Sequence, residues 1–94
     1  MSILILLKTA SAGTLESSDC LVTVSPAEKL KLKYKGANSE VFAERTMALV
    51  ENVSKRYSLS GAEISIQDQG ALEITIKARL ETALMRAVKG VTKE

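Results

Sequence analysis

The sequence has 94 residues, a mass of 10.1 kDa and a formal net charge of +2, from 13 Lys and Arg against 11 Asp and Glu. It contains no His, no Trp and one Cys, which excludes an internal disulfide, a nucleophile activated by His and a zinc site made of Cys and His. At this length we expect one domain, residues 1–94, with little room for a deep active-site pocket. We therefore expect no catalytic residue and no metal site, and any reactive group has to come from outside the polypeptide.

Neither a membrane nor a nucleic acid is an expected partner. The apolar run at residues 3–7 is too short to span a bilayer, and no positive charge precedes it as in a secretory signal. Charged residues of both signs make up 26% of the chain, and two Tyr and one Phe are too few to supply base stacking. These features predict a cytoplasmic protein.

The first part of the chain carries three expected strands. Residues 3–7 are continuously apolar, as in a buried strand. Residues 20–25 alternate with a period of two, so Cys20, Val22 and Val24 share a buried face, and Pro26 ends the strand. The next run, residues 29–35, has the same period and exposes four lysines: Lys29, Lys31, Lys33 and Lys35. The short connection between these two strands predicts a β-hairpin.

The second part predicts two helices separated by two strands. Gly36 and Asn38 supply turn and N-cap chemistry before a helix over residues 38–57. Its apolar arc consists of Phe42, Thr46, Leu49, Val50, Val53 and Tyr57. Strands over 63–67 and 72–76 flank a tight turn at residues 68–70, and the second is expected to bury Leu72, Ile74 and Ile76. From about residue 77 the period becomes helical, and Gly90 is the expected stop.

This pattern predicts an α+β domain. The expected order is three strands, a helix, two strands and a helix, with two helices packed on one face of a mostly antiparallel sheet. In that fold Cys20 is a small core residue, not a reactive thiol. Glu63 and Glu73 would face each other across the second hairpin as solvated surface groups.

Two polar features allow more than one interpretation. Residues 11–19 form either an ordinary surface loop or a loop in which Ser17 or Ser18 presents a hydroxyl for covalent modification by another enzyme. The four lysines of residues 29–35 either protect an edge strand from unwanted pairing or bind phosphates or an acidic partner.

Three segments carry a resemblance to a known family. The block Ala12-Gly13-Thr14-Leu15-Glu16-Ser17-Ser18-Asp19, the block Asp68-Gln69-Gly70-Ala71-Leu72-Glu73 and the helix start Ala78-Arg79-Leu80-Glu81 closely resemble the acyl carrier protein of citrate lyase, its gamma subunit. The similarity extends from about residue 12 to residue 90. The Asp-Ser-Leu motif of fatty-acid carriers is absent, which argues against a four-helix phosphopantetheine carrier.

The resemblance implies a non-enzymatic carrier. By it, Ser17 holds a 2′-(5″-phosphoribosyl)-3′-dephospho-CoA arm through a phosphodiester, while the position of Ser18 can also be Gly. The implied partners are an alpha subunit that exchanges acetyl for citryl, a beta subunit that cleaves the citryl thioester to oxaloacetate and acetyl thioester, and the transferase that installs the arm. The carrier then acts as a tether that raises the thioester's effective concentration at both active sites.

Three alternatives stay open at this point. The carrier subunit of malonate decarboxylase uses a related Ser-Gly-Asp loop, although Leu15-Glu16 before Ser17 favours citrate lyase. Citramalate lyase cannot be separated by this chain, because the partner subunits read the substrate. A third alternative is a small interaction module whose lysine strand binds an acidic partner or RNA. Residues 3–7 additionally suggest a docking strand, and deletion of residues 2–7 is then expected to weaken assembly while leaving the fold intact.

Overall fold

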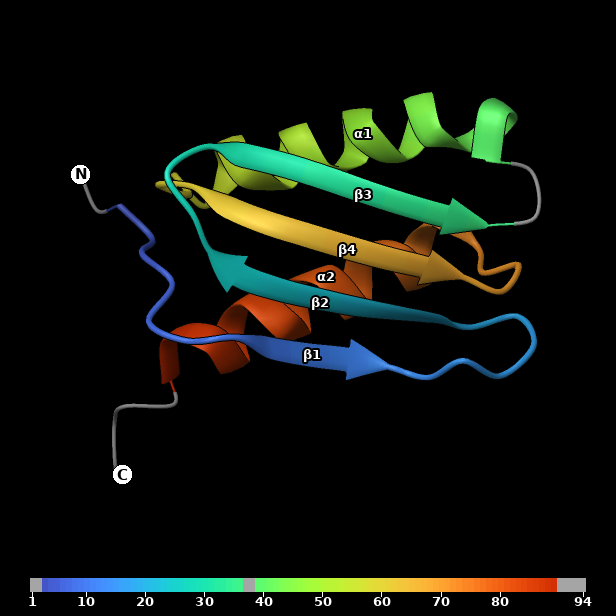
Figure 1. The fold of residues 1–94 in the computed structure, drawn as a ribbon, viewed down its shortest axis with the longest axis horizontal. Helices are drawn as coiled ribbons and strands as arrows, with labels where there is room; N and C mark the ends of the chain where they lie inside the picture. Colours follow the sequence, from blue (N-terminus) through green and yellow to red (C-terminus); the bar gives the residue numbers. More distant parts are fainter. Residues whose placement is uncertain (1–2, 37–38, 90–94) are drawn as a thin grey trace.

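The structure, a computed structural model, describes residues 3–36 and 39–89 and contains four strands and two helices (Figure 1). The elements are β1 (Ala10–Gly13), β2 (Cys20–Pro26), β3 (Leu30–Gly36), α1 (Ser39–Arg56), β4 (Ala62–Asp68) and α2 (Glu73–Lys89). The predicted helix over residues 38–57 is confirmed as α1. The predictions that rest on Asn38 and Gly90 lie outside the described residues.

The four strands form one sheet in the order β1-β2-β4-β3. β2 is antiparallel to both β1 and β4, whereas β3 is parallel to β4. Parallel neighbours need a crossover connection, and α1 provides it. The α+β class with a mostly antiparallel sheet is therefore confirmed, but the predicted hairpin between residues 20–25 and 29–35 is wrong, because β4 lies between β2 and β3.

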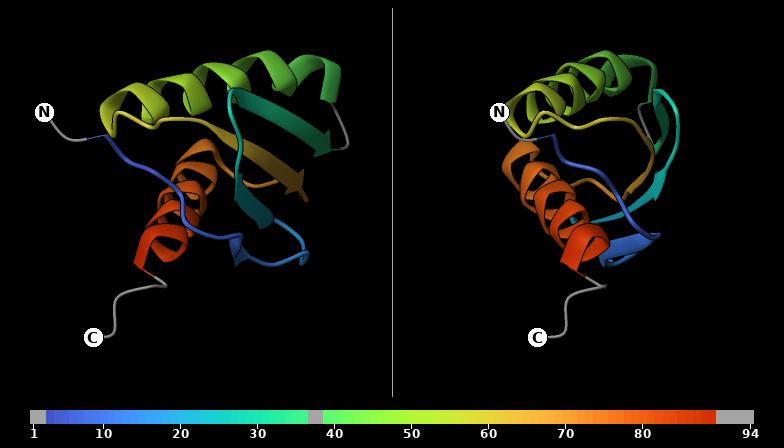
Figure 2. Two further views of the ribbon diagram at one scale, coloured as in Figure 1. Left: turned by 60° about the vertical axis from the view of Figure 1, so that its left-hand side comes forward. Right: turned by 90° about the vertical axis from the view of Figure 1, so that its left-hand side faces the viewer.

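Both helices cover the same face of the sheet, as predicted (Figure 2). The covered face is apolar because alternate strand residues point toward the helices, and Val22 faces Ile66 across the β2–β4 pair. The buried residues that α2 contributes are Ile76, Leu80, Ala83, Leu84 and Ala87. The opposite face of the sheet is polar and carries the β3 lysines on an edge strand, as the edge-protection interpretation requires.

Residues 3–7 do not form the predicted strand. The segment makes a single parallel bridge, from Leu4 to Leu59, with hydrogen bonds between Leu4 and the backbone of Ser58 and Ser60. It is therefore attached to the α1–β4 connection, and the first strand is β1 instead. Within the described ranges no helix has the length and apolar character to cross a membrane.

The predicted strand over residues 72–76 is also wrong, because α2 starts at Glu73. The Ile76 N–H donates to the Leu72 carbonyl, which begins the helical ladder. Ile76 is buried as predicted, since it continues the apolar stripe of α2, but Leu72 and Ile74 are 72% and 74% exposed. Glu73 consequently lies on a helix and does not face Glu63 across a hairpin.

Candidate functional site

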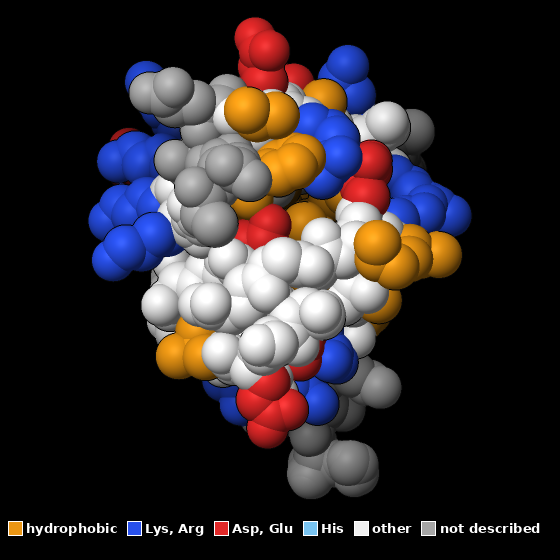
Figure 3. Space-filling view, turned by 90° about the vertical axis from the view of Figure 1, so that its right-hand side faces the viewer, with side chains coloured by type: hydrophobic (Ala, Val, Ile, Leu, Met, Phe, Trp, Pro, Cys, Tyr) orange, Lys and Arg blue, Asp and Glu red, His pale blue; other side chains and the backbone are white. Residues whose placement is uncertain are grey.

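The loop between β1 and β2, residues 14–19, places Ser17 at the surface of one end of the molecule. Residues 14–18 are exposed, and the loop lies beside the β4–α2 connection (Figure 1). Figure 3 looks at this end, where a central area of backbone and uncharged polar side chains is bordered by acidic, basic and hydrophobic side chains. The predicted modification residue is therefore accessible to another macromolecule.

The side chain of Asp19 fixes this loop through hydrogen bonds. Its carboxylate accepts two hydrogen bonds of 3.0 Å from the Arg79 guanidinium, one of 2.7 Å from the Thr14 hydroxyl and one of 2.7 Å from the Cys20 N–H. Hydrogen bonds from Arg79, Thr14 and Cys20 together lower the pKa of the Asp19 carboxyl to about 2. The carboxylate is thus fully ionised at neutral pH and links the loop to helix α2.

Asp68 shapes the neighbouring connection in the same way. One carboxylate oxygen accepts the N–H groups of Gly70 and Ala71, at 3.0 and 2.8 Å, and the other accepts the Tyr34 hydroxyl at 2.5 Å. Burial, followed by this bond to Asp68, raises the pKa of Tyr34 to about 12. The adjacent Gln69 carbonyl accepts a hydrogen bond of 2.7 Å from the Ser18 N–H. Asp68 therefore positions the connection to which the serine loop is bound.

The loop contains a tight turn, and one residue in the turn and one residue just before the loop have positive φ. The Asp19 N–H donates to the Glu16 carbonyl, and Ser18, the third residue of the turn, has φ of 67°. This conformation favours glycine, in agreement with the implied tolerance of Gly at this position. Gly13 has φ of 102°, and an added Cβ would lie 1.9 Å from the Cys20 carbonyl oxygen, so no larger residue fits there.

Ser17 itself has no activating neighbour. Among the hydrogen bonds of the described residues none involves its hydroxyl, and the carboxylate of Asp19 is fully engaged. The hydroxyl is therefore a poor nucleophile unless a second protein supplies a base. Its accessibility and its fixed position suit a group that another enzyme attaches.

Cys20 offers no competing chemistry. Its side chain is fully buried, and burial raises the pKa of the thiol to about 11. The prediction that Cys20 is a core residue is confirmed. In the described part of the chain no cluster of three or more Cys, Asp or Glu side chains could hold a metal ion.

The sequence predicted Ser17 as the modification residue, which stays a prediction, and assigned no role to the groups that position its loop. Arg79 and Asp68 appeared only as members of blocks that resemble a family, with no assigned role. One signal was available: the chain has only two aspartates, Asp19 and Asp68, and each belongs to one of these blocks. Their carboxylates hold the two connections that meet beside Ser17.

Comparisons with known proteins identify the family and the fold. The family described as malonate decarboxylase delta subunit (MdcD) matches residues 7–87. One chain of the crystal structure of a Pseudomonas malonate decarboxylase hetero-tetramer in complex with malonate superimposes with a TM-score of 0.76 at 22% identity, covering 92% of this chain and 90% of that one. The fold and the family match define the class, which is that of small α+β acyl carrier subunits.

Several curated relatives share one name. The citrate lyase acyl carrier protein of Treponema denticola is 45% identical over 83% of this chain and 90% of the relative. That of Halothermothrix orenii is 40% identical over 88% of this chain and 89% of the relative. The chain belongs to the citrate lyase acyl carrier protein family, which confirms the predicted resemblance.

Proposed function

We propose that this chain is the non-catalytic acyl carrier subunit of a citrate lyase complex and that Ser17 is its attachment residue. The observation that carries the proposal is the exposed Ser17 on a loop fixed by Asp19, in a chain whose relatives are named citrate lyase acyl carrier proteins. The expected partners are the alpha and beta lyase subunits and a prosthetic-group transferase.

The proposed arm is 2′-(5″-phosphoribosyl)-3′-dephospho-CoA, joined through a phosphodiester. In loading, the Ser17 oxygen forms a bond to the phosphorus of a phosphoanhydride donor, and the bond from that phosphorus to the leaving phosphate or pyrophosphate breaks. The hydroxyl proton passes to a base of the transferase, because no described side chain hydrogen-bonds to Ser17. Once attached, the group supplies a terminal thiol that carries acetyl and citryl as thioesters.

The protein's own contribution is then positional. Asp19 and Arg79 keep the loop in one conformation, so the attachment point has a fixed place relative to any docked subunit. A tether on a fixed anchor raises the local concentration of the acyl group to roughly millimolar at nearby active sites. This role needs no His, no reactive Cys and no deep pocket.

The decisive experiment compares the native protein with Ser17→Ala. Protein purified from its host is expected to show the mass of the arm, with peptide mapping on residue 17, whereas Ser17→Ala has the bare mass. Ser18→Ala is the matched control and is expected to load. An adduct on Ser18 or on no serine of this loop, in protein co-expressed with the transferase, contradicts the proposal.

A malonate decarboxylase carrier is the second candidate, because the matching family and the superimposed chain both bear that name. The two functions predict different partners. Acetyl-loaded protein combined with citrate lyase alpha and beta subunits is expected to restore citrate cleavage. Restoration of malonate decarboxylation alone would favour the second candidate.

A further inference from the structure

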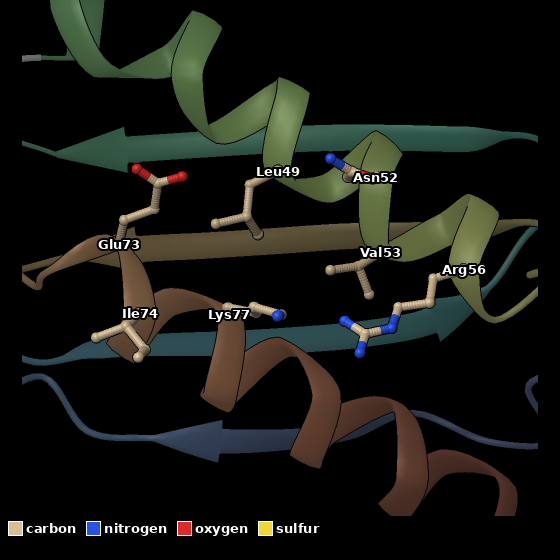
Figure 4. Close-up of a pocket in the computed structure, with 7 residues that line it drawn as sticks. All are labelled: Leu49, Asn52, Val53, Arg56, Glu73, Ile74 and Lys77. Atoms are coloured by element: carbon tan, nitrogen blue, oxygen red, sulfur yellow. The ribbon is translucent and has the colours of Figure 1, made fainter.

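A groove of about 500 Å³ lies between α1 and the first turns of α2. Leu49 and Val53 of α1 line it on one side, and Ile74 and Lys77 of α2 line it on the other (Figure 4). The first two side chains are nearly buried, while Ile74 is 74% exposed. The lining is mixed: Leu49, Val53 and Ile74 form an apolar part that the domain itself does not cover completely, and the other lining residues are Asn52, Arg56, Glu73 and Lys77.

Two cations also face this groove. Figure 4 shows the side chains of Lys77 and Arg56 extending toward one another between the helices. In the described part of the chain Lys77 has no ion-pair partner, and the contact of Arg56 with Glu81 is 3.8 Å long with the guanidinium side chain 60% exposed. A pair that is so exposed neutralises little charge. The carboxylate that lines the groove, Glu73, is 3.7 Å from Arg45, outside the lining.

The β4–α2 connection links the serine loop to the groove. Ser18 donates to the carbonyl of Gln69, and Ile74 follows Gln69 by five residues. Five residues span at most about 18 Å even when fully extended. An arm that contains two riboses, a pyrophosphate and a pantetheine chain in series has the length to reach from Ser17 into the groove.

We propose that this groove binds the arm carried by Ser17 between visits to the partner subunits, an inference that rests on the proposed function. Lys77 and Arg56 hold phosphate groups, and Leu49, Val53 and Ile74 contact the less polar pantetheine portion. The groove therefore offers cations to the phosphate groups of the arm and apolar side chains to its pantetheine portion. Because a tethered ligand has an effective concentration of roughly millimolar, an intrinsic dissociation constant near that value fills the groove for about half of the time.

The first test does not depend on Ser17. Free dephospho-coenzyme A is titrated at millimolar concentrations into the unloaded chain, and backbone amide shifts are followed by NMR. We expect shifts at Leu49, Val53, Ile74 and Lys77, and an affinity that falls by roughly fivefold or more in Lys77→Glu. Lys35→Glu, which makes the same charge change on the opposite face, is the control and should retain the affinity. Equal losses in both variants, or no shifts in the groove, overturn the proposal.

The second test uses loaded protein, with loading established by mass spectrometry. Because Cys20 is buried with a raised thiol pKa, a thiol-specific reagent at neutral pH reports on the arm. We expect the arm thiol to react roughly twofold faster in Lys77→Glu than in wild type, as expected when a half-occupied groove is emptied.

The outcomes separate this inference from the proposed function. Absence of any adduct on Ser17 refutes the proposed attachment. The NMR titration with free dephospho-coenzyme A does not depend on that attachment and still tests the groove. An adduct on Ser17 without shifts at groove amides refutes the groove alone. Shifts that appear only after partner subunits are added would assign the groove to a protein contact and overturn the proposal.

Discussion

Arg79 donates two parallel hydrogen bonds of 3.0 Å to Asp19, from Nε to Oδ1 and from Nη2 to Oδ2, and joins the serine loop to α2 across 60 residues of sequence. Such a paired geometry fixes orientation as well as distance. Asp19 also accepts from Thr14 within the same loop. The position of Ser17 is thus set by a helix that begins more than fifty residues later in the chain.

Arg79→Met should leave the domain folded and slow the loading of Ser17. The variant keeps the length of the side chain but removes both hydrogen bonds, so the loop samples more conformations. A displaced nucleophile costs on the order of tenfold to hundredfold in rate. Arg86→Met, which also lies on α2 but bonds only to the Ser11 carbonyl, is the matched control. Equal loading rates for both variants, measured by intact mass against time, would show that the Asp19 contact does not position the serine.

The Asp19 carboxyl should titrate with a pKa of about 2, below its ordinary value of 3.8. Because the folded-state pKa is the lower one, the stabilising effect of the ionised group is present above about pH 4 and is lost as the pH falls toward 2. Carboxyl carbon shifts measured by NMR provide the titration. In Arg79→Met the pKa should return toward 3.8, whereas an unchanged value would assign the shift to other partners.

Tyr34 should titrate with a pKa of about 12, above its ordinary value of 10. Its folded-state pKa is raised, so the stabilisation from the neutral phenol is complete below about pH 10 and is lost as the pH rises through 12. Tyrosinate absorbance is a clean probe, because the chain has no Trp. Tyr34→Phe should remove the late titration and, by leaving a buried Asp68 oxygen without its donor, should cost roughly 1–3 kcal/mol of stability. A late titration that persists in this variant contradicts the assignment.

Gly13→Ala should destabilise the domain more than Gly70→Ala. Both glycines have positive φ, of 102° and 92°, so each substitution imposes a backbone strain of roughly 1–3 kcal/mol. Only at Gly13 does the new Cβ also collide with backbone, since nothing lies within 4 Å of the Cβ position at Gly70. Chemical denaturation of the two variants measures the difference. Equal losses would mean that the backbone at Gly13 moves aside freely.

Leu6→Ala should cost roughly 2–5 kcal/mol, because Leu6 is 4% exposed and belongs to the core. Ile5→Ser, at a position that is 58% exposed, should change stability by no more than about 0.5 kcal/mol. Deletion of residues 2–7 removes Leu6 from the core. It should therefore destabilise the fold, contrary to the expectation from the sequence. Because Ile5→Ser should preserve the fold, this variant tests a docking role for the segment. If the segment docks onto a partner, Ile5→Ser should weaken assembly.

Local patterns predicted much of the fold. The helix α1 and the strand β2 each bury one face. The spacing of apolar residues within each segment therefore predicts the element without any information from the rest of the chain. The prediction of a strand over residues 72–76 was wrong because Leu72, Ile74 and Ile76 alternate with polar residues as in a strand. The Gly70 and Ala71 N–H groups instead donate to the Asp68 side chain, two and three residues back, and direct the chain into α2. This is a local Asx-type turn, a signal that the strand prediction did not use.

The sheet order and the supports of Ser17 could not be predicted for the same physical reason. The parallel pairing of β3 with β4 joins segments separated by the whole of α1, and Tyr34 meets Asp68 across 34 residues. Such contacts follow from the packing of complete elements. The exposed serine itself was predictable, because a polar run of small residues between strands lies at the surface.

The placement of β4 between two earlier strands imposes an order on biosynthesis. Residues 20–36 leave the ribosome with their central neighbour still missing, and the sheet closes only after Asp68 has followed. The guanidinium of Arg79 emerges later still. A transferase that recognises the shaped loop would therefore act only after Arg79 has been synthesised, so chains truncated before Arg79 would escape modification.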